Sequence, residues 1–161
     1  MIGLDLMKMF SLFVILTVTG GNASACERSL AGTWKSDRQA TMAFVRENAK
    51  LQSKTEDFLQ ALVGHMTLTF RKNELHLVMP DIEVPVSGEK RPFAGFEERK
   101  PYKMLFCSAS MIVFSTKGSF SDSHEATTFN FVGPDTVWVY MGTTRSGVPD
   151  INAREYFQRI R

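Results

Sequence analysis

The sequence predicts a mainly β protein, built as one antiparallel barrel of about eight or nine strands with two short helices inserted after the first strand. Short segments with apolar residues at every second position recur after residue 65, and turn residues separate them. Helical spacing of apolar residues is confined to residues 37–63. Regularly spaced strands with few helices are typical of antiparallel barrels and sandwiches.

The chain begins with a segment of the export type. Lys8 precedes the uncharged apolar run MFSLFVILTV, and a stretch of small residues ends at Ala25. This order predicts a secretory signal peptide over residues 1–25. The run is about half of the roughly 20 residues that a membrane span needs. We therefore expect an exported protein, periplasmic in a bacterium or secreted, with residues 26–161 forming one domain. A cleaner signal begins at Met7, which makes the true start codon an open point.

Cys26 and Cys107 are the two cysteines of the chain, and they allow two interpretations. In an oxidising compartment, a single pair favours a disulfide over a metal site. Alternatively, the small residues before Cys26 resemble a lipobox, although Ala23 stands where such boxes usually carry Leu. A lipid on Cys26 would anchor the protein in the envelope, and we expect no other membrane contact. Both alternatives remain open at this stage.

Three elements are expected before residue 65: a strand over 29–34 and helices over 37–49 and 54–63. Ser36 with Gln39, and Ser53 with Glu56, have the spacing of helix capping boxes. Gly64 marks the end of the second helix. The apolar faces of both helices are narrow, so we expect the helices to lie on the sheet.

A hairpin over residues 65–79 is the clearest local prediction. The sequence HMTLTFRKNELHLVM alternates on both sides of Lys72-Asn73. A two-residue turn there places Phe70 opposite Leu75 and Leu68 opposite Leu77, and it places Met66 opposite Met79. All six apolar side chains then share one face, which a slip of one residue would destroy.

The remaining strands are expected after this hairpin, over residues 82–86, 102–108, 111–116, 125–132, 136–141 and 154–160. The turn Gly133-Pro134-Asp135 is expected to set Phe131 near Trp138 and Phe129 near Tyr140. Residues 87–101 show no period and contain two Pro and two Gly, so they predict one long, lid-like loop.

The tripeptide Gly32-Thr33-Trp34 on the first predicted strand resembles the opening Gly-x-Trp motif of the lipocalins and the wider calycin families. The resemblance implies a lipocalin-like barrel with Trp34 closing one end and a basic residue of a late strand packed on the indole. Arg159 is the candidate for that residue, and such a contact is worth roughly 1 kcal/mol. The match covers two short motifs. In addition, the helices here follow the first strand, whereas the common lipocalin pattern places its helix after the barrel.

No catalytic signature is present in the sequence. There is no G-x-S-x-G, no Gly-rich phosphate loop and no C-x-x-C, and the zinc-protease-like start at His124-Glu125 lacks its second His because Thr128 stands there. We therefore expect a protein that is not an enzyme and has no catalytic residue, metal or cofactor. The formal net charge of +2 and the export signal argue against a nucleic-acid partner.

Aromatic, aliphatic and methionine side chains on the strands are the candidates for a ligand site. They could line a pocket for an apolar or amphipathic small molecule, and this is the leading hypothesis for function. The candidate ligand-binding residues are Met66, Leu68, Phe70, Leu77, Met104, Phe106, Phe114, Phe129, Phe131, Trp138 and Tyr140. Small barrels usually fill their interiors, however. The alternative is therefore a non-enzymatic interaction module or inhibitor with a filled core that binds an envelope protein partner.

Overall fold

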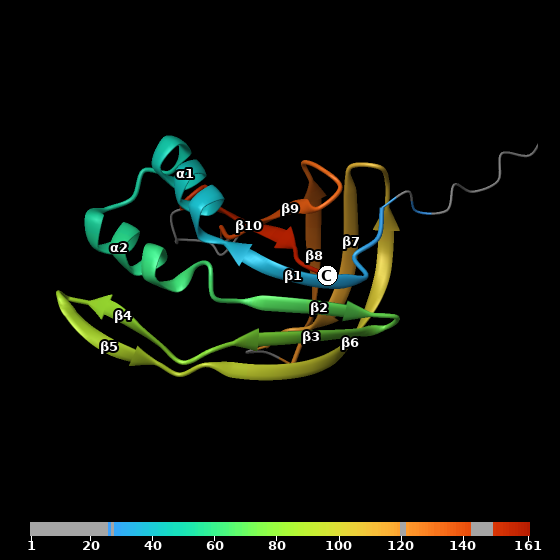
Figure 1. The fold of residues 1–161 in the computed structure, drawn as a ribbon, viewed down its shortest axis with the longest axis horizontal. Coiled ribbons are helices and arrows are strands. Elements are labelled where there is room, and N and C mark those ends of the chain that lie inside the picture. Colours follow the sequence, from blue (N-terminus) through green and yellow to red (C-terminus); the bar gives the residue numbers. More distant parts are fainter. Residues whose placement is uncertain (1–25, 27, 120–121, 143–149) are drawn as a thin grey trace, which may run out of the picture.

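The predicted mainly β barrel with two helices is confirmed in the computed structural model, which describes residues 26, 28–119, 122–142 and 150–161 (Figure 1). The predicted signal peptide over residues 1–25 lies outside the described residues. The elements in chain order are β1 (Gly32–Asp37), α1 (Arg38–Asn48), α2 (Ser53–Leu62), β2 (Thr67–Arg71), β3 (Glu74–Met79), β4 (Ile82–Val86), β5 (Glu89–Phe93), β6 (Phe96–Cys107), β7 (Met111–Lys117), β8 (His124–Phe131), β9 (Thr136–Tyr140) and β10 (Arg154–Arg159).

Eight antiparallel strands close the barrel in the order β1-β10-β9-β8-β7-β6-β3-β2, an architecture consistent with a calycin-like fold. β4 and β5 form a separate two-stranded sheet, which projects from the barrel beneath α2 (Figure 1). The predicted β2–β3 register is confirmed, because Phe70 pairs with Leu75 and Leu68 pairs with Leu77. The described β2–β3 pairing begins at Thr67 and Val78, so Met66 lies just before the ladder.

The two helices lie on sheets, as their narrow apolar faces predicted: α1 on the outside of the barrel and α2 on the separate β4–β5 sheet. α1 packs against β10 and α2 against β4 (Figure 1). A second apolar core joins them to the segment before β10, with Met42, Val45, Leu59, Val63 and Ala153 as its buried residues. The helices therefore stabilise the sheet from outside and leave the barrel interior to the strands.

The predicted capping boxes are wrong, although the helices themselves are confirmed to within about a residue at each end. Asp37 caps α1, since its Oδ1 accepts a hydrogen bond of 3.0 Å from the backbone N–H of Ala40. Ser36 instead belongs to β1, which extends further than predicted. Gln52 precedes α2 without a side-chain capping bond. Gly64 has a φ of +89°, in agreement with its predicted role after α2.

The predicted loop over residues 87–101 is wrong. This region forms β5 and the first half of β6, and β6 pairs with β3 from Glu74–Pro101 to Met79–Phe96. Alternation is present in β6, but charged residues occupy some of its inward positions. Glu98 and Lys100 are partly buried, whereas their neighbours Glu97 and Arg99 are exposed. Hydrophobic periodicity alone therefore missed this strand.

The predicted register of the late hairpin is also wrong by one residue. Phe131 pairs with Val137, and Asn130 pairs with Trp138. The three turn residues Gly133-Pro134-Asp135 are enclosed by a hydrogen bond of 3.1 Å from the Val132 N–H to the Thr136 carbonyl. This parity places Val137 in the barrel core and turns the next residue, Trp138, outward.

Trp138 and its neighbour Tyr140 therefore lie outside the barrel. The Arg154 guanidinium carbon lies 4.0 Å from the Trp138 ring centroid and 4.4 Å from the ring of Phe44 on α1. This stacking gives the indole a partner on the outer surface. Tyr140 is exposed.

Cys26 and Cys107 form a disulfide, with Cα atoms 5.6 Å apart and a sequence separation of 81. The bridge fastens the segment before β1 to the end of β6. Arg28 lies close to the same place, because its Nε donates to the Ala109 carbonyl at 3.1 Å. A molecule with this bridge has no free thiol on Cys26, so the disulfide and a lipid on Cys26 are mutually exclusive. Within the described ranges, neither helix is long and apolar enough to cross a bilayer.

Candidate functional site

A cavity of about 210 Å³ lies inside the barrel, on the side away from Trp34. Apolar side chains form its floor and walls: Met66, Leu68, Leu75, Leu77, Phe114, Phe129, Val139 and Phe157. Polar and charged residues form its rim: Lys100, Thr116, Lys117, Gly118, Ser119, Glu125, Thr127 and Glu155. The two kinds of lining match an amphipathic molecule of modest size, since sites for drug-sized ligands usually measure about 300–1,000 Å³.

Aromatic rings fill the interior beyond the cavity floor. Phe70 makes edge-to-face contacts with Tyr102, Phe114 and Phe129, with ring centroids 5.4–5.6 Å apart. Phe129 also stacks on Phe157 at 6.1 Å. These rings are buried against the Trp34 side of the core. The barrel is thus filled in one half and open in the other.

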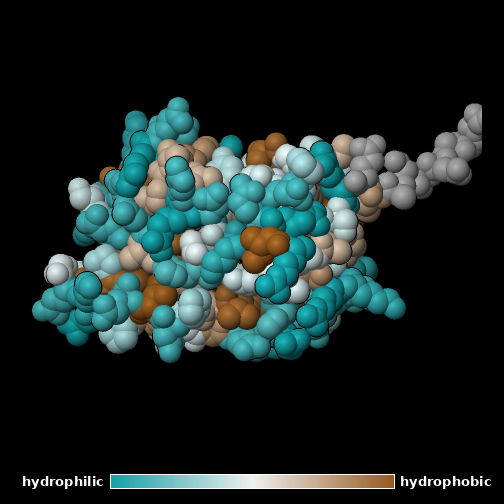
Figure 2. Space-filling model, in the orientation of Figure 1, coloured by the Kyte–Doolittle hydropathy of each residue, from teal (hydrophilic) through white to brown (hydrophobic). Residues whose placement is uncertain are grey.

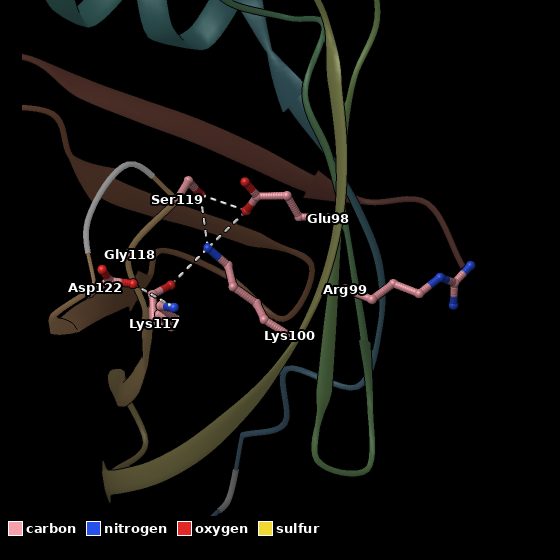
Figure 3. A pocket seen from close by; sticks show the side chains of 7 residues that line it. All are labelled: Glu98, Arg99, Lys100, Lys117, Gly118, Ser119 and Asp122. Carbon is pink, nitrogen blue, oxygen red and sulfur yellow. Dashed lines mark hydrogen bonds and ion pairs between the residues drawn. The ribbon is translucent and has the colours of Figure 1, made fainter.

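Lys100 on β6 holds the polar rim together. Its Nζ donates to Ser119 Oγ at 2.8 Å and to the Lys117 carbonyl at 2.9 Å, and it lies 3.1 Å from Glu98 Oε2. Figure 3 shows these three acceptors around the ammonium group, while Arg99 extends from the opposite side of the strand. An ammonium group has three hydrogens, so the protein itself satisfies Lys100 completely.

Ser119 donates to Glu98 Oε2 at 2.8 Å, and this bond together with Lys100 lowers the pKa of Glu98. Lys117 Nζ forms an ion pair of 2.7 Å with Asp122. The rim on the β6–β7 side is therefore a set of charges that neutralise one another. Its role in the fold is to join β6 to the turn that follows β7.

Glu155 on β10 stands across the rim from this network. Glu155 and Phe157, two residues apart on β10, share one face of the strand, and both line the cavity. Glu155 Oε1 accepts a hydrogen bond of 2.5 Å from the Ser36 hydroxyl. Ser36 Oγ in turn accepts from the Gly64 N–H at 2.8 Å, which directs the hydroxyl hydrogen toward the carboxylate. Burial raises the pKa of Glu155, and the Ser36 bond partly opposes that effect.

Two openings lead to the cavity. An open basin of about 500 Å³, lined by Glu98 and Asp122 among others, shares Lys100, Lys117, Gly118 and Ser119 with it (Figure 3). On the other side, the described β8–β9 pairing ends at Asn130–Trp138. A groove of about 700 Å³ is lined mainly by residues of β8 and β9 at and beyond the end of this pairing and shares Glu125, Thr127 and Val139 with the cavity. A ligand could therefore enter through the barrel mouth or between β8 and β9.

The structure brings five of the eleven predicted ligand residues to the cavity: Met66, Leu68, Leu77, Phe114 and Phe129. Two others are packed in the core, where Phe70 belongs to the aromatic cluster and Phe131 contacts Trp34 edge-to-face at 6.1 Å. Met104 and Phe106 are exposed on β6 beside an irregularity in the β6–β7 register. Trp138 and Tyr140 lie outside, as described above.

The sequence interpretation missed the polar half of the site. Lys100 and Glu98 were assigned to a loop, and Glu155 received no role. The sequence held a signal for both strands. In β6, the alternation of buried and exposed positions continues from Tyr102 toward the N-terminus through Lys100. In β10, Glu155 lies an even number of residues from Arg159, which was expected to pack on Trp34, so both side chains fall on the same face of the strand. Among the described residues, no three or more His, Cys, Asp or Glu side chains lie together as a metal-binding group.

Comparisons with known proteins give no relatives for this chain: no protein-family model matches it, and neither the curated proteins nor the solved structures contain a match. The geometry of the cavity is therefore the basis for assigning a function.

Proposed function

We propose that this protein is a non-enzymatic binding protein that holds a small amphipathic molecule in the open half of its lipocalin-like barrel. The observation that supports the proposal is the 210 Å³ cavity with an apolar floor and a charged rim. A core selected only for stability would be filled to the density of the aromatic half. The openings at the mouth and between β8 and β9 give a ligand access.

Native mass spectrometry of the protein purified from its own host tests this proposal. We expect a bound small molecule that is released on denaturation. The variant Leu77→Phe replaces a side chain that lines the cavity by a larger aromatic one and should abolish the bound mass. The control Val78→Phe alters the adjacent residue, which does not line the cavity, and should retain the bound mass. Loss of the ligand in both variants, or its retention in both, would contradict binding in the cavity.

We also propose that the protein works outside the cytoplasm. The Cys26–Cys107 bridge supports an oxidising compartment, and the predicted signal over residues 1–25 supports export. Fractionation of the native host should recover a shortened protein outside the cytoplasm. Recovery of the full-length chain in the cytoplasmic fraction would refute this part of the proposal.

A second candidate function, an envelope interaction module, has one observation in its favour. Leu105 and Phe106 are each 52 % exposed, and Met104 is 38 % exposed beside them, so three consecutive large apolar residues are exposed. The face seen in Figure 2 is mostly hydrophilic, with small separate apolar areas. Crosslinking in the native envelope should then capture one partner protein, and Phe106→Lys should abolish the crosslink, while the exposed Ile160→Lys leaves it intact.

A further inference from the structure

Glu155 differs from the other charged residues at the cavity in the partners it has. Lys100 has its three hydrogens taken by Glu98, Ser119 and the Lys117 carbonyl, and Lys117 pairs with Asp122. Within the described part of the chain, the carboxylate of Glu155 has one hydrogen-bond donor, the hydroxyl of Ser36, and no ion-pair partner. A carboxylate can accept about four hydrogen bonds, so most of its accepting capacity is left for a ligand.

Because Glu155 is largely buried, a ligand group that donates hydrogen bonds to its carboxylate would be strongly favoured. The carboxylate is enclosed by the barrel wall, where burial raises its pKa because the charged form is poorly solvated. A positive group placed beside it would remove that penalty. Such a charge-assisted hydrogen bond is stronger in a site with little water than on the surface. Ser36 is held by Gly64 and keeps one oxygen of Glu155 oriented.

The surroundings of Glu155 define the rest of the ligand. Val139 is its register partner on β9, and Phe157 is the next inward residue on its own strand. Both line the cavity, together with Leu68 and Phe129. A short apolar body would therefore lie on this floor while its polar end meets the carboxylate. The cavity volume of about 210 Å³ limits that body to about the size of a single ring or a short alkyl chain.

An anionic head group fits this site poorly. It would meet the carboxylates of Glu155 and Glu125 at the rim. Of the two cations in the lining, Lys100 has no hydrogen left to donate unless its bonds to Glu98, Ser119 or the Lys117 carbonyl are broken, and the charge of Lys117 is already paired with Asp122. Like charges without a donor would cost binding energy, so the polar end of the ligand should be neutral or positive.

We propose that the cavity is selective for a small organic cation, a primary or secondary ammonium with a short apolar body, whose nitrogen donates hydrogen bonds to the free oxygen of Glu155. This inference rests on the proposed function and specifies its ligand class. Glu155 is the residue that determines specificity, and Ser36 positions its carboxylate.

Calorimetry with three matched probes at pH 7 tests the inference: benzylamine, benzyl alcohol and benzoate share one ring and differ in the charge of the head group. We expect benzylamine to bind about tenfold or more tightly than benzyl alcohol, and benzoate to bind most weakly. Glu155→Gln should weaken benzylamine binding by about tenfold and leave benzyl alcohol binding unchanged. Glu125→Gln, which removes a carboxylate at the rim, should have a smaller effect on benzylamine.

The outcomes separate this inference from the proposed function. If benzyl alcohol binds as tightly as benzylamine, or Glu155→Gln changes neither affinity, the ammonium inference is wrong, while binding that Leu77→Phe blocks still supports the cavity. If benzoate binds most tightly, the selectivity is the reverse of the one proposed. If none of the three probes binds, the ammonium inference fails, and the mass spectrometry of host-purified protein decides the proposed function by itself.

Discussion

The guanidinium carbon of Arg159 lies 4.3 Å from the ring centroid of Trp34, its register partner across β1 and β10. Trp34 is fully buried, and its Nε1 donates to the Leu30 carbonyl at 2.8 Å. Arg159 also donates to the backbone carbonyls of Ala31 and Ser29. Its Nε lies 3.1 Å from Asp135, close enough for an ion pair but without hydrogen-bond geometry. One side chain thus fastens the last strand, the segment before the first strand and the β8–β9 turn.

Replacing Arg159 with Lys should destabilise the fold because a Lys keeps the charge but loses the planar group that stacks and binds two carbonyls at once. We expect a loss of about 1–3 kcal/mol in the free energy of unfolding, measured by urea denaturation. Arg71→Lys at an exposed position should change it by less than about 0.5 kcal/mol. Equal effects of the two substitutions would contradict the role assigned to Arg159.

The Trp34–Arg159 contact was expected through the resemblance of Gly32-Thr33-Trp34 to the calycin motif, which implies a basic residue of a late strand on the indole. The β2–β3 hairpin was predictable because its six apolar residues tolerate a single register. The β8–β9 register was not, since both faces of that hairpin are apolar and a shift of one residue leaves the pattern equally hydrophobic. The register is set by the three-residue turn, which the hydrogen bond from Val132 to Thr136 closes.

The polar half of the candidate site was hidden for a different reason. Lys100 and Glu98 face inward yet are charged, so β6 loses its apolar alternation where it passes the cavity. Three-dimensional partners such as Ser119, 19 residues along the chain from Lys100, make this burial tolerable. Local sequence patterns carry no record of such partners. Of the two residues that interrupt the strand pattern, Lys100 lines the cavity and Glu98 lines the adjoining basin.

The disulfide should contribute substantially to stability, because it joins residues 81 apart in sequence. In the chain-entropy model, a loop of this length adds about 4–5 kcal/mol, and measured disulfides typically contribute about 2–4 kcal/mol. Reduction with dithiothreitol, or Cys107→Ser, should lower the urea midpoint without abolishing β-sheet circular dichroism, since the barrel strands pair independently of the bridge. As a control, the double variant Cys26→Ser with Cys107→Ser has no cysteine, so its urea midpoint should be the same with and without dithiothreitol.

Truncation of Phe129 should both destabilise the protein and enlarge its cavity. Phe129 is buried, contacts Phe70, Phe114 and Phe157, and also lines the cavity. Phe129→Ala should cost about 3–5 kcal/mol. Binding a larger apolar probe in the new space would recover part of this loss, as a rise in melting temperature with probe concentration. Phe44→Ala, which removes a ring packed between α1 and β10 outside the barrel, should give no such ligand-dependent rise.

Glu155 and Glu98 should affect stability with opposite dependence on pH. The pKa of Glu155 is raised above its ordinary value of 4.5, so above that pH the folded state holds more protons than the unfolded chain. The stability contribution of Glu155 is complete below pH 4.5 and is lost as the pH rises through the raised pKa. Glu155→Gln should therefore increase the melting temperature at pH 8 relative to the wild type and have less effect at pH 4.

Glu98 provides the contrast because the Ser119 hydrogen bond and Lys100 lower its pKa. Its stability contribution is present above its ordinary pKa of 4.5 and is lost as the pH falls through the lowered value. Glu98→Gln should therefore lower the melting temperature at pH 7 and have progressively less effect toward pH 3. Both Gln variants preserve side-chain shape, so a packing defect would shift the melting temperature equally at every pH. Parallel pH profiles for the two variants would show that burial does not oppose the charge of Glu155, and the physical reason for an ammonium ligand at that carboxylate would be lost.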